Sequence, residues 1–231
     1  MSRKIEKRHY IYTIGIPIVI LVLLLQIESL MGELEYKNDY LQATILNVST
    51  QKALQRIDSE RQTSLNKIMD IMARYNQAMP IAQRKQIARE IYNMSKKYPN
   101  LNIDFIAATI THESANTWDP NVVSHVGAIG LMQIMPSTGQ FLAGEEGIEW
   151  TGDDILFDPL INIRLGCRYL SEMVTMYEHD GGLAAYNAGP RIAQLWLASN
   201  RNNDILWEET RGYVPAILKL YAEFQTEDAL F

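Results

Sequence analysis

Cysteine is almost absent from this sequence. The single residue, Cys167, cannot form an internal disulfide, so the fold must be stabilised by packing alone. It lies in the apolar segment NIRLGCRYL, where a buried and chemically inert thiol is expected. The four histidines are scattered along the chain and form no cluster, which argues against a zinc site. We therefore predict no metal centre.

The sequence also lacks an excess of basic residues and the alternating pattern of β-strands. The net charge is −6, whereas nucleic-acid-binding proteins usually carry a basic face, so we expect no nucleic-acid partner. No stretch shows sustained alternation of apolar and polar residues with period two, so we predict an all-α fold. A hydrophobic content of 47% is too high for a disordered chain.

Charge is lacking altogether between residues 10 and 27. This run of apolar residues is about long enough to cross a bilayer as a helix, which takes roughly 20 residues. Residues 1–9 carry a charge of +3, and a basic flank of this kind stays in the cytoplasm. The sequence ESLMGELEY that follows contains no small-x-small cleavage site, so an uncleaved anchor is favoured over a signal peptide. A buried globular helix is the third alternative.

The pattern thus predicts a single-pass protein of the cytoplasmic (inner) membrane, with the rest of the chain on the periplasmic or extracytoplasmic side. Residues 1–9 form a basic cytoplasmic tail and residues 10–27 a transmembrane signal anchor. Residues 28–80 read as a helical stalk or linker, or as helices packed against the following domain, because their apolar stripe is too irregular for a long coiled coil. Pro80 ends this region, and residues 81–231 form the main domain.

The main domain shows apolar periodicity typical of helices, separated by loops rich in glycine, acidic residues or asparagine. We expect helices over residues 87–98, 103–114, 131–143, 161–179, 183–199 and 213–225.

One glutamate stands out by its position on a predicted helix. Apolar residues recur three and four positions apart between Ile103 and Ile110, and continuing this face reaches Glu113 and Ser114. A carboxyl on the buried side of a helix should have a raised pKa, and one that keeps its proton near neutral pH can act as a general acid. A structural glutamate paired with an arginine would give the same pattern.

Three later segments hold residues suited to binding a polar ligand. Small residues between Gly127 and Gly130 allow close backbone approach, and Gln133 follows with an amide that can both donate and accept. An aromatic residue and an amide precede the break at Gly189-Pro190, and the segment ETRGYV comes later. Each segment alone is weak.

Taken in order, these segments resemble the lytic transglycosylases of the soluble-transglycosylase (SLT) type, whose catalytic domain is similar to goose-type lysozyme. The resemblance covers roughly residues 84 to 225. It is carried by Glu113-Ser114, SHVGAIGLMQIMPST (124–138), LFDPLINIRLGCRYL (156–170), AAYNAGP (184–190) and ETRGYV (209–214). It implies an all-α, lysozyme-like catalytic domain that acts on peptidoglycan (murein) glycan strands without a cofactor.

The resemblance also implies residue roles. Glu113 matches the catalytic acid/base, and Glu209 and Thr210 match supporting positions. Asp158, in LFDP, is expected to cap the next helix. The substrate-binding residues implied are Ser114, Ser124, Gln133, Met135, Tyr186, Asn187 and Tyr213. The stretch ESANTWDPNVVS is about two residues longer than the family's usual form, so the shape of this loop is not implied.

The implied reaction is a non-hydrolytic cleavage of the β-1,4 bond between N-acetylmuramic acid and N-acetylglucosamine, which gives 1,6-anhydromuramyl ends. A lysozyme-type muramidase is the first alternative and would need a second carboxylate. The candidates for it are Asp119, Glu145, Glu146, Glu149, Asp153 and Asp154. A non-catalytic wall-binding module is the second alternative.

Overall fold

The structure is a computed structural model that describes residues 15–227. The predicted basic tail (1–9) and the first part of the predicted anchor (10–14) lie outside the described residues. The chain divides into two compact units, one up to Ser59 and the other from Glu60 onward, and each is described by itself.

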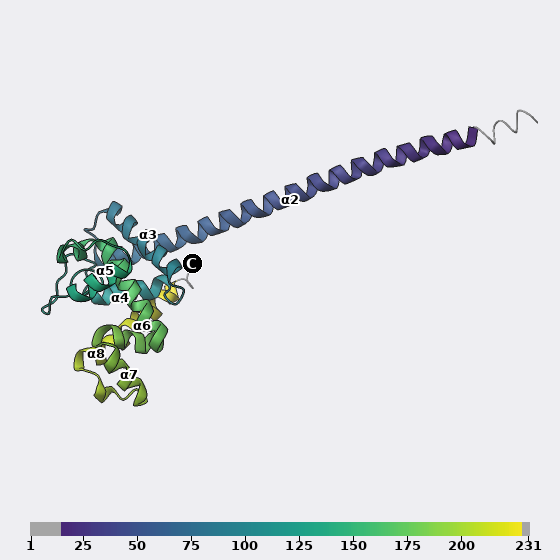
Figure 1. Cartoon of the computed structure of the whole chain (residues 1–231). Helices are drawn as coiled ribbons and strands as arrows, with labels where there is room; N and C mark the ends of the chain where they lie inside the picture. The colour runs from purple at the N-terminus through teal and green to yellow at the C-terminus, as the bar shows by residue number, and fades with distance from the viewer. Residues whose placement is uncertain (1–14, 228–231) are drawn as a thin grey trace, which may run out of the picture. The chain divides into compact units, whose positions relative to one another are not determined.

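The all-α prediction is confirmed for the described residues, which contain no strand (Figure 1). Only isolated β-bridges occur, between Val123 and Ile129 and between Ile129 and Ile134. The α-helices are α2 (Ile16–Tyr75), α3 (Ile81–Lys97), α4 (Ile103–Glu113), α5 (Pro136–Glu145), α6 (Pro159–Ala188), α7 (Pro190–Ala198) and α8 (Glu208–Glu227). Two short 3-10 helices are η2 (Asp153–Phe157) and η3 (Asn203–Ile205).

The first unit consists of the N-terminal part of α2. This helix is long and apolar enough near its start to cross a membrane, and no residue of its most apolar stretch is buried against protein. The exposed side chains there are aliphatic, including Leu21, Leu24 and Leu25, each more than half exposed. Such a surface is unfavourable in water and compatible with lipid.

The second unit includes the last turns of α2. Ile68, Ile71 and Met72 are fully buried in the core of this unit. Lys67 forms an ion pair with Asp104 of α4 at 2.8 Å, and both side chains are only 10% exposed. The last turns of α2 are therefore part of the folded second unit.

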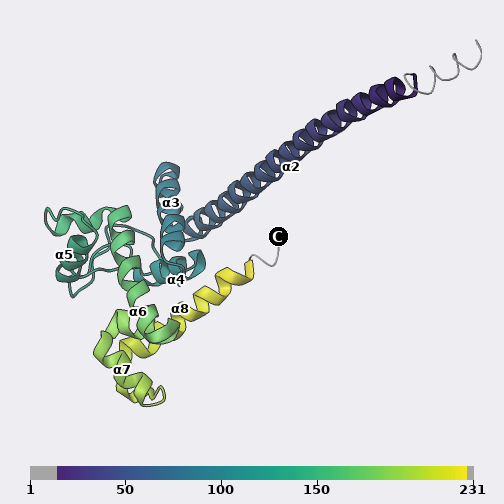
Figure 2. The same cartoon turned by 45° about the vertical axis from the view of Figure 1, so that its right-hand side comes forward.

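The chain turns where proline predicts it. α2 ends at Tyr75 and α3 begins at Ile81, directly after Pro80. α4 then packs between α3 and α8 (Figure 2). Its residues from Asp104 to Thr111 are all buried. The carboxyl end of this central helix is therefore fixed on several sides.

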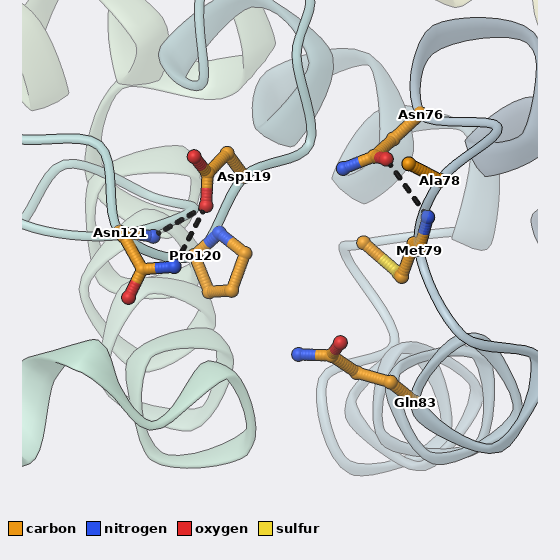
Figure 3. A pocket seen from close by; sticks show the side chains of 7 residues that line it. All are labelled: Asn76, Ala78, Met79, Gln83, Asp119, Pro120 and Asn121. Atoms are coloured by element: carbon orange, nitrogen blue, oxygen red, sulfur yellow. Dashed lines mark hydrogen bonds between the residues drawn. The ribbon is translucent and has the colours of Figure 1, made fainter.

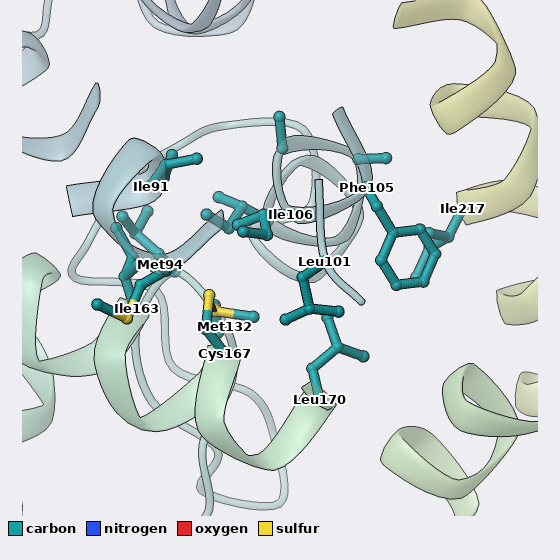
Figure 4. Close-up of a cluster of buried hydrophobic side chains, with 14 of the residues drawn as sticks. Ile91, Met94, Leu101, Phe105, Ile106, Met132, Ile163, Cys167, Leu170 and Ile217 are labelled. Carbon is teal, nitrogen blue, oxygen red and sulfur yellow. Dashed lines mark hydrogen bonds between the residues drawn. The ribbon is translucent and has the colours of Figure 1, made fainter. Parts of the chain in front are cut away.

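α6 connects the two ends of the second unit. α5 packs beside one part of it, whereas α7 and α8 pack beside its later part (Figure 2). Asp158 caps α6 as expected, because its carboxylate accepts hydrogen bonds from the backbone N–H groups of Leu160 (2.8 Å) and Ile161 (3.1 Å). The core lies between α3, α4 and α6, where Ile91, Ile106 and Cys167 pack together (Figure 4).

Several predicted helices have different limits in the structure. Residues 131–135 are not helical, and α5 begins only at Pro136, because a residue before proline disfavours helical backbone and Gln133 has a positive φ of 46°. The helices predicted over 161–179 and 183–199 divide at Gly189-Pro190 instead, and α6 continues to Ala188 through a kink at Glu178 (φ 61°).

Candidate active site

Glu113 is the last residue of α4, at the end of the most deeply buried helix of the domain. Its side chain is half-buried, and its Oε1 accepts a hydrogen bond of 2.5 Å from the Tyr213 hydroxyl. Burial raises the pKa of Glu113 to about 8, the Tyr213 hydrogen bond acts in the opposite direction, and the nearby charge of Glu209 raises it further. The carboxyl is therefore largely protonated at neutral pH.

Tyr213 reaches Glu113 from α8, which packs along α4. The tyrosine is 3% exposed, and burial beside Glu113 raises its pKa well above the ordinary value, so it remains a hydrogen-bond donor. The ring of His112 meets the Tyr213 ring edge-on with centroids 4.9 Å apart. Burial lowers the pKa of His112, against the opposing effect of Glu209.

Tyr186 and Asn187 stand at the end of α6, just before the Gly189-Pro190 break. The Tyr186 hydroxyl donates to the backbone carbonyl of Met132 at 2.8 Å. Burial raises the pKa of Tyr186, and the charge of Glu113 adds to this effect. Tyr213 therefore contacts Glu113 directly, whereas Tyr186 is linked to it through the electrostatic effect on its pKa.

Asn187 is held by the first turn of α8. Its Oδ1 accepts a hydrogen bond from the Thr210 hydroxyl at 2.6 Å, and its Nδ2 donates to Glu209 at 3.3 Å. Thr210 is fully buried. The ETRGYV segment therefore fixes both the amide of Asn187 and, through Tyr213, the carboxyl of Glu113.

Ser124 and Gln133 belong to the loop between α4 and α5. Ser124 closes a tight turn, since its hydroxyl accepts from the Ala128 N–H at 2.9 Å. The Gln133 amide nitrogen donates to the carbonyls of Gly130 (2.8 Å) and Val122 (3.2 Å), which leaves its oxygen as the acceptor for a ligand. Met135 occupies the position before the first residue of α5 and is 40% exposed.

A buried asparagine fixes this loop on α6. The Asn162 Oδ1 accepts from the Met132 N–H at 2.8 Å, and its Nδ2 donates to the carbonyls of Ile129 (2.8 Å) and Leu156 (2.9 Å). Gly130 has a φ of 83°, and a Cβ there would lie 2.3 Å from the Asn162 amide nitrogen. Glycine is therefore required at this close approach.

Ser114 occupies a different place from the other predicted binding residues. It is fully buried, and its hydroxyl accepts from the Trp118 N–H at 3.0 Å. Trp118 is also fully buried and donates from its indole to Thr111 at 3.0 Å. Ser114 is thus positioned to shape the loop that follows Glu113, and no part of it is exposed for contact with a sugar.

Two of the candidates for a second carboxylate take part in ion pairs. Glu145 and Glu146, in the acidic loop, form ion pairs with Arg168 at 3.4 and 3.1 Å. Among the described residues, Glu209 is the carboxylate whose charge acts on the pKa of Glu113. Its spacing of four residues from Tyr213 on one helix places both on the same face and could have indicated this.

The described part of the chain, residues 15–227, contains no group of three or more His, Cys, Asp or Glu side chains arranged to hold a metal ion. The chemistry available at this site is proton transfer by a raised-pKa carboxyl, surrounded by phenol and amide groups.

Comparison with known proteins places the chain in a family. The transglycosylase SLT domain model matches residues 90–206, just over half of the chain. The chain belongs to the transglycosylase SLT family. It is 34% identical over 145 residues to the soluble lytic murein transglycosylase of Escherichia coli, a match that covers 58% of this chain and 22% of that one. The Salmonella typhimurium protein of the same name is 31% identical over 147 residues, covering 59% and 22%.

Solved structures of lytic transglycosylases are also similar to this chain. An inactive glutamate-to-glutamine mutant of the lytic transglycosylase Slt from Pseudomonas aeruginosa has a TM-score of 0.53 and 32% identity, covering 64% of this chain and 24% of that one. The complex of the 70-kDa soluble lytic transglycosylase with bulgecin A has a TM-score of 0.52 and 30% identity, covering 62% and 25%. This SLT-family chain spans only about a quarter of the length of these relatives.

Proposed function

We propose that this SLT-family chain is a membrane-anchored lytic transglycosylase that cleaves peptidoglycan glycan strands, with Glu113 as the single acid/base. Family membership supports the substrate class, since its relatives are named lytic murein transglycosylases. The observation that carries the proposal is the state of Glu113, a half-buried carboxyl with a pKa of about 8 that contacts Tyr213. A general acid for cleavage at neutral pH must keep its proton at that pH, which a carboxyl with a raised pKa does.

The first step is protonation of the leaving oxygen. Because Oε1 of Glu113 accepts from Tyr213, the proton resides on Oε2 and is free to move to the glycosidic oxygen. The bond from C1 of N-acetylmuramic acid to that oxygen breaks, and the sugar's own 2-acetamido group stabilises the positive charge at C1. The departing strand keeps the proton, and Glu113 becomes an anion that the Tyr213 hydroxyl stabilises.

The second step closes a ring within the sugar. The Glu113 carboxylate removes the proton of the 6-hydroxyl, and the 6-oxygen forms a bond to C1. The product is a 1,6-anhydromuramyl end, water is not consumed, and Glu113 regains its proton. In our proposal, Gln133, Asn187 and Tyr186 orient the ring and its acetamido group, Ser124 and Met135 border the sugar, and Ser114 positions the loop.

Product analysis tests the proposal directly. Purified peptidoglycan is digested with the full chain in detergent, and the released fragments are analysed by mass spectrometry beside a Glu113→Gln variant. Anhydro-muropeptides from the wild type alone would support both the reaction and the residue. An equal yield from the variant would refute the role of Glu113, and no release from either would favour a non-catalytic wall-binding module.

Hydrolysis is the second candidate, and the position of Glu209 is the observation that favours it. Its exposed carboxylate lies close enough to Glu113 to act on its pKa, so it could hold an attacking water. A muramidase would give reducing ends that carry ¹⁸O when the digestion is run in H₂¹⁸O. Anhydro ends without ¹⁸O would eliminate this candidate.

The membrane anchor and periplasmic location are also proposals. They are supported by the exposed apolar start of α2 and by the basic residues before it. An anchor would keep the domain at high local concentration beside the wall, which compensates for the absence of electrostatic attraction between an acidic enzyme and an anionic polymer. Alkaline carbonate washing of cell membranes should leave the chain in the pellet, and its release into the supernatant would contradict an integral anchor.

A further inference from the structure

A pocket lies between two segments that are far apart in the sequence. One wall is the turn after α2 with the first turn of α3, and the other is the loop at residues 119–121 (Figure 3). Its volume is about 360 Å³, within the range of ligand-binding pockets. The first wall, residues 76–83, lies outside the segment that matches the SLT family.

The lining combines amide groups with apolar surface. Three carboxamide side chains face the pocket, and each can both donate and accept. Ala78, Met79 and Pro120 supply the apolar part. The carboxamides are those of Asn76, Gln83 and Asn121.

Two of these carboxamides are held in place by the protein. The Asp119 carboxylate accepts from both the backbone N–H and the side-chain amide of Asn121, each at 2.9 Å. Asn76 accepts from the Met79 N–H at 2.9 Å and donates to the Trp118 carbonyl at 3.4 Å. Gln83, by contrast, makes no hydrogen bond with any described residue, and its amide points across the pocket toward the other wall (Figure 3).

The loop wall is also directly connected to Glu113. Trp118, which precedes the pocket residue Asp119, is bound to the Ser114 hydroxyl next to Glu113. Ala115, Asn116 and Trp118 all have positive φ values between 50° and 61°. Such backbone is costly for non-glycine residues and persists where the surroundings enforce it, often next to binding sites. The loop wall is thus tied by a hydrogen bond to Ser114, the residue that follows Glu113.

We propose that this pocket binds a secondary amide with a neighbouring methyl group, as part of the same polymer that is cut at Glu113. The free Gln83 amide would pair with the N–H and C=O of the ligand, while the methyl group packs on Met79 and Pro120. Peptidoglycan offers this chemistry in two places, the N-acetyl groups of its glycan and the alanine residues of its stem peptides. The inference rests on the proposed function for the choice of polymer.

Binding is measured on full-length chain in detergent carrying Glu113→Gln, so that no turnover occurs. The probes are di-N-acetylchitobiose and the dipeptide L-alanyl-D-isoglutamine, followed by saturation-transfer NMR titration. Gln83→Ala removes the free amide without breaking an internal hydrogen bond, and Ala78→Trp fills the pocket. Gln86→Ala, an exposed glutamine on the same helix, is the matched control.

We expect Gln83→Ala to weaken one probe about 2- to 10-fold, the effect of one neutral hydrogen bond, and Ala78→Trp to weaken it more. Loss of dipeptide binding alone identifies the stem peptide as the ligand, and loss of chitobiose binding alone identifies the glycan. Unchanged affinity for both probes in both pocket variants, relative to Gln86→Ala, would overturn the proposal.

A second readout separates this inference from the proposed function. In the chain with intact Glu113, Gln83→Ala should raise the KM for peptidoglycan about 2- to 10-fold with kcat unchanged. If the wild type yields no anhydro product while the pocket variants still lose probe binding, the proposed function fails and the pocket stands. If anhydro product forms normally and neither KM nor probe binding responds, the pocket proposal fails alone.

Discussion

The Tyr213 hydroxyl donates a hydrogen bond of 2.5 Å to Oε1 of Glu113, across 100 residues of sequence. This contact joins the end of α4 to the first half of α8 and reserves one carboxyl oxygen, leaving the other for the substrate. Glu209, four residues before Tyr213, raises the pKa of the same carboxyl, whereas the Tyr213 hydrogen bond lowers it. Substituting one or the other residue should therefore shift the pKa of Glu113 in opposite directions.

Removing the Tyr213 hydroxyl should move the pH profile upward. The proposed reaction requires protonated Glu113, so kcat/KM should fall as the pH rises through about 8. The Tyr213 hydrogen bond favours the charged carboxylate, so Tyr213→Phe raises the pKa further and shifts this decline to higher pH. The plateau rate should drop about 10- to 100-fold, because the anion formed in the first step loses a charge-assisted hydrogen bond. A pH profile of kcat/KM measures both effects, and an unchanged alkaline limb would contradict this account.

Neutralising Glu209 should move the pH profile downward. Its negative charge raises the pKa of Glu113, so Glu209→Gln should bring the alkaline decline to lower pH while preserving the acceptor for Asn187. Glu208→Gln, the exposed neighbour on the same turn, is the control and should leave the profile in place. Complete loss of activity in Glu209→Gln would instead indicate that Glu209 is a second catalytic carboxylate.

The stability of the chain should also record the pKa of Glu113. In the folded chain the carboxyl keeps its proton up to a pKa of about 8, whereas the ordinary value is 4.5. The folded state therefore binds more protons between these values, and the wild type loses stability as pH rises through this window. Glu113→Gln removes that loss, so its advantage in free energy of unfolding should be near zero at pH 4 and about 2 kcal/mol at pH 8–9.

Urea unfolding at several pH values measures this difference. Glu223→Gln, which changes an exposed carboxylate on α8, serves as the control and should show no comparable trend. A constant difference between Glu113→Gln and the wild type from pH 4 to pH 9 would show that the Glu113 pKa is not raised.

The helix pattern around Glu113 was sufficient to predict its position. The apolar spacing from Ile103 to Ile110 pointed Glu113 toward the protein interior, and the structure places it half-buried at the end of α4. Tyr213, in the last of the segments that carry the family resemblance, donates a hydrogen bond to this carboxyl. Local periodicity and motif order are thus enough to find the centre of the site.

Features that depend on long-range contacts could not be predicted in this way. Glu209 looks like any exposed glutamate until the packing of α8 on α4 brings it near Glu113. Gln133 lies in a segment with helical periodicity, yet Pro136 and the hydrogen bonds of Asn162 hold the preceding loop out of a helix. Such outcomes are decided by tertiary contacts rather than by local propensity.

The end of α2 gives a stability prediction with a control on the same helix. Ile71 is fully buried in the core of the second unit, whereas Ile57 is 56% exposed in the first. Ile71→Ala should lower the free energy of unfolding by about 2–4 kcal/mol through lost burial and a cavity, and Ile57→Ala by less than about 0.5 kcal/mol. Equal effects in urea unfolding would show that residues 60–75 are not an integral part of the folded domain.

Asn162 gives the strongest link between the core and the candidate site. Asn162→Ala leaves the Met132 N–H and the carbonyls of Ile129 and Leu156 buried without their partner, which should cost about 2–4 kcal/mol. Asn93→Ala, at an exposed position on α3, should cost less than about 0.5 kcal/mol.

Asn162→Ala should impair catalysis even where the chain is still fully folded. The Met132 carbonyl also accepts the hydrogen bond from Tyr186, so a loosened loop displaces a phenol that interacts electrostatically with Glu113. At a temperature where Asn162→Ala is still fully folded by circular dichroism, kcat should therefore be about 10-fold lower than in Asn93→Ala, because small misplacements at an active site are costly. A normal kcat in a destabilised but folded Asn162→Ala chain would mean that this asparagine stabilises the fold without positioning the site.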